Sequence, residues 1–222
     1  MTINKQLETL TFAQASQRLE MFLTRSTRTL LGIIGPPGAG KSTLALQLNA
    51  LNPEQSQIVP MDGYHLANIE LERLGRASRK GAPDTFDSYG YVALLKRLRG
   101  QMPEETVYAP EFRREIEEPI AGAIPIFAKA KLLIAEGNYL ALDQGGWSHV
   151  AALLDEIWYV EVDPSLRLER LIARHMQFGR TQQAAQAWAQ TTDEPNARLI
   201  ESTLGRVHYK VLPAPWGMRN QL

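Results

Sequence analysis

The chain contains no cysteine among its 222 residues. Disulfide bonds and cysteine-ligated metal sites are therefore excluded, and the composition suits a reducing compartment. No stretch approaches the roughly 18 consecutive apolar residues that a membrane-spanning helix requires. The N-terminal stretch up to Arg18 is polar and lacks the apolar run of a secretion signal. We therefore expect a cytoplasmic protein with no membrane segment.

The sequence also lacks an excess of charge of either sign, because 24 lysines and arginines balance 24 aspartates and glutamates. A strongly basic surface for nucleic acid is not indicated, and we expect no nucleic-acid partner. Internal repeats and low-complexity segments are absent as well. The length suits one domain with a buried core, so we assign residues 1–222 to a single domain.

Short apolar segments alternate along the chain with segments of helical periodicity. The predicted strands are Leu30–Ile34, Gln57–Met61, Lys131–Glu136, Glu156–Val162 and Val207–Leu212. The predicted helices are one after Thr11, one from Asp87 or Ser88 to Arg99, one over Pro164–Gln177 and one from Asn196 to about Thr203. Alternating strands and helices predict an α/β fold of three layers, a parallel sheet flanked by helices. The carboxyl ends of its strands then meet at one edge, where ligands bind in such sheets.

The segment from Leu30 to Leu48 reads LLGIIGPPGAGKSTLALQL. It fits the phosphate-binding loop pattern G-x-x-x-x-G-K-[ST] without a mismatch, and a predicted strand and helix flank it. Glycines let backbone N–H groups turn towards a phosphate, and the helix N-terminus adds partial positive charge. Lys41 can reach the β- and γ-phosphates, and the Ser42 hydroxyl can ligate Mg²⁺. A turn that merely needs glycine is the disfavoured alternative.

We therefore expect a nucleoside triphosphate and Mg²⁺ at this loop. The loop residues assigned to the nucleotide are Gly35, Pro36, Pro37, Gly38, Ala39, Gly40, Lys41, Ser42 and Thr43.

Two carboxylates follow directly on predicted strands. Asp62 ends the strand Gln57–Met61, where it could accept a proton from a hydroxyl; an Asp-Gly turn is the structural alternative. Glu136 ends the strand Lys131–Glu136, where an acid can help to organise a nucleotide-bound Mg²⁺; a turn acid before Gly137 is its alternative.

Arginines recur on one face of the helix Pro164–Gln177. Arg167, Arg170 and Arg174 are spaced i, i+3 and i+7, and Arg180 follows Gly179. Arginine suits bidentate phosphate contacts, and such a helix can close over the γ-phosphate. A solvated basic face is the alternative. We assign Arg170, Arg174 and Arg180 to a lid over about residues 164–192, and expect Arg167 to lie at the surface.

Polar and aromatic residues elsewhere could bind the second substrate. The segment Arg79–Gly90 is polar and kinked, as recognition loops are. Residues 107–127 look like an irregular, substrate-side insertion with a small hairpin. A histidine in the position of His65 is more often one with ordinary structural partners than a catalytic base. The predicted substrate-binding residues are Asp62, Tyr64, His65, Lys80, Phe86, Tyr108, Arg113, Glu136 and Tyr139.

Seven segments together resemble one group of P-loop kinases, which includes phosphoribulokinase, uridine kinase and bacterial pantothenate kinase. In chain order they are GPPGAGKST, MDGYH, RKGAPDTFD, VYAPEFRREIEEP, LLIAEGNYL, DPSLRLERLIARHMQFGR and DEPNARLIESTLGR. The resemblance extends from about Leu30 to about Leu212. It is greatest to short bacterial proteins that are similar to nucleoside kinases.

The resemblance implies transfer of the γ-phosphoryl group of ATP to a hydroxyl of a small metabolite. It implies that Asp62 is the base, that Lys41 and Arg174 act with it in catalysis, and that Ser42 and Glu136 serve the metal. Arg170 is implied in the lid, and Asn196 and Arg206 border the adenine. The segment after VYAPEF lacks the tyrosine–serine–histidine run of pantothenate kinases. The acceptor therefore stays open between a pantothenate-like, a nucleoside-like and a sugar-like molecule.

Two other functions are weighed against a kinase. One is a nucleotide-gated regulatory ATPase without a small acceptor, which would need neither Asp62 nor the Arg79–Gly90 loop. The other is an NTPase acting on nucleic acid, which the balanced charge disfavours. A homodimer is compatible with the sequence.

Overall fold

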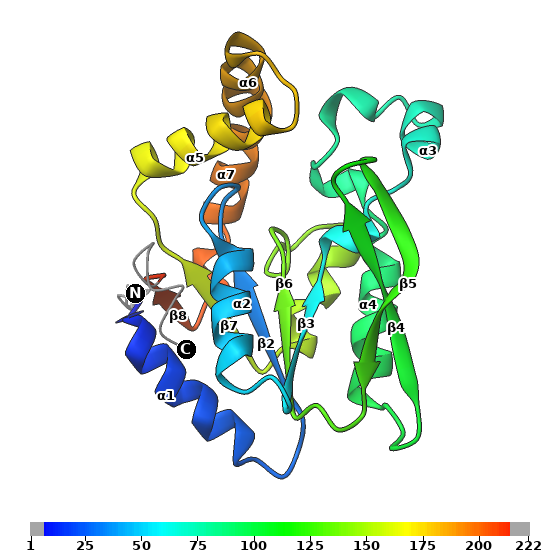
Figure 1. Cartoon of the computed structure of the whole chain (residues 1–222), viewed down its shortest axis with the longest axis vertical. Coiled ribbons are helices and arrows are strands. Elements are labelled where there is room, and N and C mark those ends of the chain that lie inside the picture. Colours follow the sequence, from blue (N-terminus) through cyan, green and yellow to red (C-terminus); the bar gives the residue numbers. More distant parts are fainter. Residues whose placement is uncertain (1–6, 214–222) are drawn as a thin grey trace, which may run out of the picture.

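Six parallel strands form the central sheet in the computed structural model, which describes residues 7–213 (Figure 1). Their order across the sheet is β1-β8-β7-β2-β6-β3. The strands are β1 (Thr9–Leu10), β2 (Thr29–Ile34), β3 (Ser56–Pro60), β6 (Leu132–Glu136), β7 (Glu156–Val160) and β8 (Tyr209–Val211). Every residue of β2, β6 and β7 is buried, as expected for central strands covered on both faces.

Helices cover both faces of this sheet, so the three-layer α/β prediction is confirmed. They are α1 (Phe12–Leu23), α2 (Lys41–Leu51), α3 (Asn68–Arg73), α4 (Ser88–Arg99), α5 (Pro164–Gln177), α6 (Gln182–Trp188) and α7 (Glu194–Glu201), with a π-helix at Ala189–Asp193. Short 3₁₀ helices lie at Asp62–Tyr64, Ala77–Arg79, Pro83–Thr85, Gly145–His149, Ala151–Leu153 and Leu204–Arg206. One apolar cluster joins α1 and α2 to the sheet, and a second joins α4 to its other face.

Local sequence signals explain where several helices begin. The Thr11 side chain accepts from the Gln14 backbone in a capping box. Asp87 caps α4, and Asp163 caps α5 ahead of Pro164. The predicted boundaries need small corrections: β3 ends at Pro60, β7 at Val160 and β8 at Val211, and α7 begins at Glu194.

The segment 107–127 is more regular than the expected irregular insertion. It forms a two-stranded antiparallel ribbon of β4 (Thr106–Arg113) and β5 (Glu118–Phe127), with one irregularity between Ala109 and Glu111. Val107, Ala109 and Ile126 form its buried face and join the apolar cluster of α4. This alternating pattern, which is typical of a half-buried ribbon, overrides the proline and glycine content. The ribbon stands on the β3 side of the molecule (Figure 1).

Within residues 7–213, the structure contains no helix that is both long enough and apolar enough to cross a membrane.

A buried ion pair fixes α1 to the sheet. Glu156 opens β7 and is 5% exposed. Its carboxylate accepts from Arg18 Nε at 2.7 Å, from a second Arg18 nitrogen, and from Trp158 Nε1 at 2.9 Å. Because a buried carboxylate needs such partners, the contact specifies how α1 docks.

Arg18→Ala is expected to lower the free energy of unfolding by about 2–3 kcal/mol, because Glu156 then remains buried without its counter-charge. The value lies below that for a fully buried pair, since 26% of the Arg18 side chain is exposed. Urea denaturation followed by circular dichroism measures it. Arg73→Ala, which breaks an exposed pair with Glu70, is the control and should leave the midpoint nearly unchanged. Equal effects of the two substitutions would contradict this account.

Candidate active site

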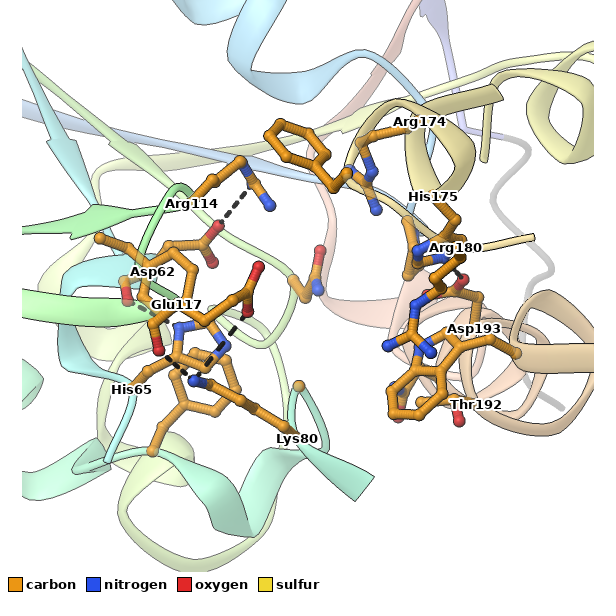
Figure 2. Close-up of a pocket in the computed structure, with 18 of the residues that line it drawn as sticks. Asp62, His65, Lys80, Arg114, Glu117, Arg174, His175, Arg180, Thr192 and Asp193 are labelled. Atoms are coloured by element: carbon orange, nitrogen blue, oxygen red, sulfur yellow. Dashed lines mark hydrogen bonds and ion pairs between the residues drawn. The ribbon is translucent and has the colours of Figure 1, made fainter. Parts of the chain in front are cut away.

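A cavity of about 480 Å³ opens at the carboxyl ends of the central strands. Figure 2 shows two facing walls. One carries Asp62, His65, Lys80, Arg114 and Glu117, and the other carries Arg174, His175, Arg180, Thr192 and Asp193. The predicted site residues that line the cavity are Pro37, Lys41, Ser42, Asp62, His65, Lys80, Phe86, Glu136, Arg174, Arg180 and Asn196.

The phosphate-binding loop joins β2 to α2 at the floor of the cavity. Gly38 and Gly40 have φ values of +82° and +91°, a backbone conformation that side chains disfavour. A Cβ at Gly38 would lie 2.7 Å from Leu171 Cγ, so the loop packs directly on α5. Gly40 caps α2 without a side-chain hydrogen bond. The first turn of α2 is therefore suited to a phosphate in both geometry and partial charge.

Buried charges of opposite sign meet beside this loop. Lys41 and Glu136 are 8% and 7% exposed. Burial lowers the pKa of Lys41, which the charges of Glu136 and Asp62 counteract. Burial also raises the pKa of Glu136 to about 7, against the charge of Lys41. The neighbouring opposite charges thus oppose the desolvation that would neutralise each group.

The Ser42 hydroxyl lies close enough to the Glu136 carboxylate to oppose the rise in its pKa. Hydroxyl and carboxylate oxygens suit Mg²⁺, which is usually held by one or two protein groups together with substrate phosphates. Among the described residues, no group of three or more His, Cys, Asp or Glu could hold a metal ion by itself. The residues present therefore fit a metal that arrives with a nucleotide.

Asp62 lies just beyond the end of β3, at the start of a 3₁₀ helix. The Met61 N–H donates to the Glu136 carbonyl at 2.7 Å, which fixes this segment beside the end of β6. Asp62 Oδ2 lies 3.4 Å from a nitrogen of Arg114. His65 Nδ1 lies 2.7 Å from the Asp62 carbonyl, and burial lowers the pKa of this imidazole.

Two of the three arginines assigned to the lid, Arg174 and Arg180, lie on the opposite wall. Burial lowers the pKa of Arg174, and the charge of Arg114 lowers it further. Arg180 stacks on Trp188, with 4.0 Å from its Cζ to the ring centroid. Arg170 does not line the cavity, although its guanidinium would lie 3.9 Å from a Cβ at Gly40. Helix α5 therefore approaches the phosphate-binding loop at Arg170, beside Gly40, and at Leu171, beside Gly38.

The expectation that Arg167 lies at the surface is wrong. Its side chain is 8% exposed and pairs with Glu194 at 2.5 Å. A Cβ at Gly38 would lie 2.9 Å from the Arg167 carbonyl. The arginines of α5 therefore have different roles in the structure. Arg167 pairs with the first residue of α7, whereas Arg174 faces the cavity.

Several predicted site residues do not line the cavity. Tyr108 points away from the buried face of β4, and Arg113 pairs with Glu111 at 2.6 Å. The Tyr139 hydroxyl donates to the Gly81 carbonyl, Tyr64 packs on Tyr91, and Arg206 pairs with Asp143. Gly35, Pro36, Gly38, Ala39, Gly40 and Thr43 belong to the loop without lining the cavity themselves.

Other lining residues were not predicted from the sequence. They are Asn68, Phe112, Arg114, Glu117, Asn138, His175, Phe178, Trp188, Thr192 and Asp193, besides smaller residues. For the ribbon, apolar Val107 and Ala109 on either side of Tyr108 are a strand signal in the sequence, but that signal does not reach the turn that carries Arg114 and Glu117. The pair of His175 and Asp193, at 2.7 Å, joins segments that no local pattern connects.

A phosphate-binding loop, an acid beyond β3 and an arginine-bearing lid together define a P-loop kinase architecture. A scan against models of protein families found no match. The chain is 34% identical over 193 residues to "Putative uridine kinase C227.14" of Schizosaccharomyces pombe, covering 82% of each chain. It is 35% identical over 178 residues to "Uncharacterized protein YggC" of Escherichia coli, covering 78% of this chain and 73% of that one.

Among solved structures, a "putative fructose transport system kinase" of Silicibacter sp. TM1040 is 37% identical, with a TM-score of 0.81. The match covers 91% of this chain and 98% of that one. The chain belongs to the P-loop kinases of the uridine kinase and pantothenate kinase type.

Gly63→Ala tests the close packing between β4 and the glycine that follows Asp62. A Cβ at Gly63 would lie 2.2 Å from the Pro110 carbonyl oxygen of β4, which is backbone and cannot turn aside. The substitution should lower the free energy of unfolding by about 1–3 kcal/mol, as overpacking does. Thermal and urea denaturation measure this.

Gly205→Ala is the matched control, since it also lies in a 3₁₀ helix but has open space around it. Destabilisation by Gly205→Ala equal to that by Gly63→Ala would show that the Pro110 contact is not the cause.

Proposed function

We propose that the chain transfers the γ-phosphoryl group of ATP to a hydroxyl of a small metabolite. The observation that carries this proposal is that Lys41, Asp62 and Arg174 line one cavity. A phosphate-binding loop alone would serve any nucleotide hydrolase. A carboxylate across the cavity from a lid arginine is what an alcohol acceptor requires.

The donor half is proposed to bind ATP together with Mg²⁺. Lys41 and the first turn of α2 supply positive charge to the β- and γ-phosphates. Ser42 and Glu136 would hold the metal, which neutralises phosphate charge when bound. Asn196, which lines the cavity, and Arg206 are proposed at the adenine border, as the resemblance implies.

The acceptor half is proposed to centre on Asp62. An acceptor hydroxyl donates to the carboxylate and loses its proton to it as the new O–P bond forms. The bond from the γ-phosphorus to ADP breaks, and its electron pair stays on the ADP oxygen. Because such transition states are largely dissociative, positioning and electrostatic stabilisation supply most of the rate acceleration.

An acceptor screen tests this function directly. Purified protein with ATP and Mg²⁺ is offered pantothenate, uridine or fructose, representing the three acceptor classes, and the phosphorylated product is detected by mass spectrometry. Stoichiometric product with one class supports the kinase. If ADP is released at the same rate with and without every acceptor, including further members of each class, the result would favour the regulatory ATPase instead.

Asp62→Asn should lower transfer by roughly 10²-fold, towards the lower end of the range for a general base, because the transition state is loose. Calorimetric binding of MgATP should change little, since the amide preserves size. Lys41→Ala is the comparison, and it should impair both transfer and nucleotide binding. If Asp62→Asn transfers phosphate at the unaltered rate, Asp62 is not the base. If the variant instead binds ATP more weakly only when Mg²⁺ is present, Asp62 serves the metal.

Arg174→Ala should lower kcat by about 10²-fold and weaken ATP binding much less, because the guanidinium acts on charge that moves during transfer. Steady-state kinetics with calorimetry separates the two effects. Arg198→Ala is the control, since that side chain on α7 is 76% exposed. Equal losses of kcat and affinity would mean that Arg174 only binds the ground state.

A further inference from the structure

The tip of the β4–β5 ribbon reaches into the cavity, although its sequence resembles an ordinary charged turn. The turn comprises residues 114–117, and both Arg114 and Glu117 line the cavity. Glu117 has a φ of +53°, and it is the one non-glycine residue with positive φ among residues 7–213. Strain of this kind persists where surrounding contacts impose it.

Contacts from two neighbouring segments impose this conformation. The Asn68 N–H donates to both carboxylate oxygens of Glu118, at 3.0 and 3.2 Å. The Glu117 carbonyl accepts from Asn68 Nδ2 at 3.3 Å and from the Lys80 ammonium. Lys80 in turn donates to Asn68 Oδ1 at 2.6 Å. The tip is therefore held at its base independently of Arg114.

Arg114 lies near charged groups of both signs that line the cavity. Its contact with Asp62 is made at 3.4 Å, longer than the about 2.7–2.9 Å of a well-formed charge-assisted bond. Besides the larger effect of burial, its charge lowers the pKa of Lys41 and of Arg174. Figure 2 shows Arg114 and Arg174 extending into the cavity from opposite walls.

Two guanidinium groups that face each other repel unless an anion lies between them. The phosphate-binding loop lies at the floor of the same cavity, so the γ-phosphoryl group of a bound triphosphate is the anion that would reach this position. We propose, resting on the kinase function above, that Arg114 contacts the transferring phosphoryl group from the side opposite to Arg174.

The contact with Asp62 gives this arginine a defined sequence of partners. Before transfer, the Asp62 carboxylate offsets the charge of Arg114. When the acceptor O–H bond breaks and its proton passes to Asp62, that carboxylate becomes neutral. Arg114 then pairs with the phosphoryl group, whose bond to the acceptor oxygen forms as its bond to ADP breaks. Base protonation and charge stabilisation are thereby coupled.

The test uses MgADP with aluminium fluoride, which mimics the phosphoryl group in transfer and needs no identified acceptor. Calorimetry compares the affinity for MgADP with and without aluminium fluoride. In the unaltered chain, aluminium fluoride should strengthen binding. Arg114→Ala should lose about 10²-fold of that gain, the scale for one preorganised donor, while binding of MgADP alone stays within about twofold. Arg114→Lys should recover part of the gain.

Two further variants test whether Arg114 contacts the phosphoryl group directly. One controls for loss of positive charge on the ribbon, and the other controls for an effect of Arg114 through Asp62. Arg113→Ala is the matched control, because the neighbouring arginine is exposed and pairs with Glu111 outside the cavity. It should keep the full gain. Asp62→Asn should keep or increase the gain, because Arg114 is then released from its carboxylate.

Full gain in Arg114→Ala would overturn the contact while leaving the kinase function intact. Loss of the gain in Asp62→Asn equal to that in Arg114→Ala would also overturn it, because Arg114 would then act only through Asp62. Absence of any gain in the unaltered chain would contradict the kinase function itself and the contact with it. Thermal melting checks that each variant is folded.

Discussion

Two opposite charges buried at the carboxyl edge of the sheet constrain the rest of the structure. Lys41 and Glu136 are almost fully removed from solvent, and each would tend to neutralise without the other. The lysine is delivered by the loop after β2, and the glutamate by β6, the strand paired with it. Adjacent parallel strands are what allow these ends to meet. A phosphate entering here encounters a cation that water screens poorly.

The walls of the cavity are built outward from this edge by close backbone packing. Gly137 allows Met61 to approach, since a Cβ there would lie 2.5 Å from Met61 Cβ, and Asp62 follows directly. The Pro110 carbonyl of β4 packs directly on Gly63, so the position of β4 is tied to that of the residues after Asp62. On the other side, Gly38 receives α5. Each wall of the cavity thus packs on the sheet or its loops at a glycine, where there is no room for a Cβ atom.

Local signals in the sequence predicted the phosphate-binding loop and several helix starts well, and the walls of the cavity less well. The phosphate-binding loop, the strand that ends in Glu136 and the caps Thr11, Asp87 and Asp163 depend on neighbours within a few residues. Arg167 was misjudged because its partner, Glu194, is distant in sequence. Helical spacing placed Arg167 and Arg174 on one face, but it could not tell that one packs on α7 and the other faces the cavity.

The ribbon shows a second limit of local reasoning. Arg113 and Arg114 are adjacent and chemically identical, but Arg113 ends β4 outside the cavity whereas Arg114, the first residue of the turn, lines it. The conformation of the turn depends on Asn68 and Lys80, which lie far ahead of the turn in the sequence. The same contacts hold the cavity wall that carries Arg114 and Glu117. The phosphate-binding loop is therefore encoded in one contiguous motif, whereas the wall that carries Arg114 depends on the packing of three separate segments.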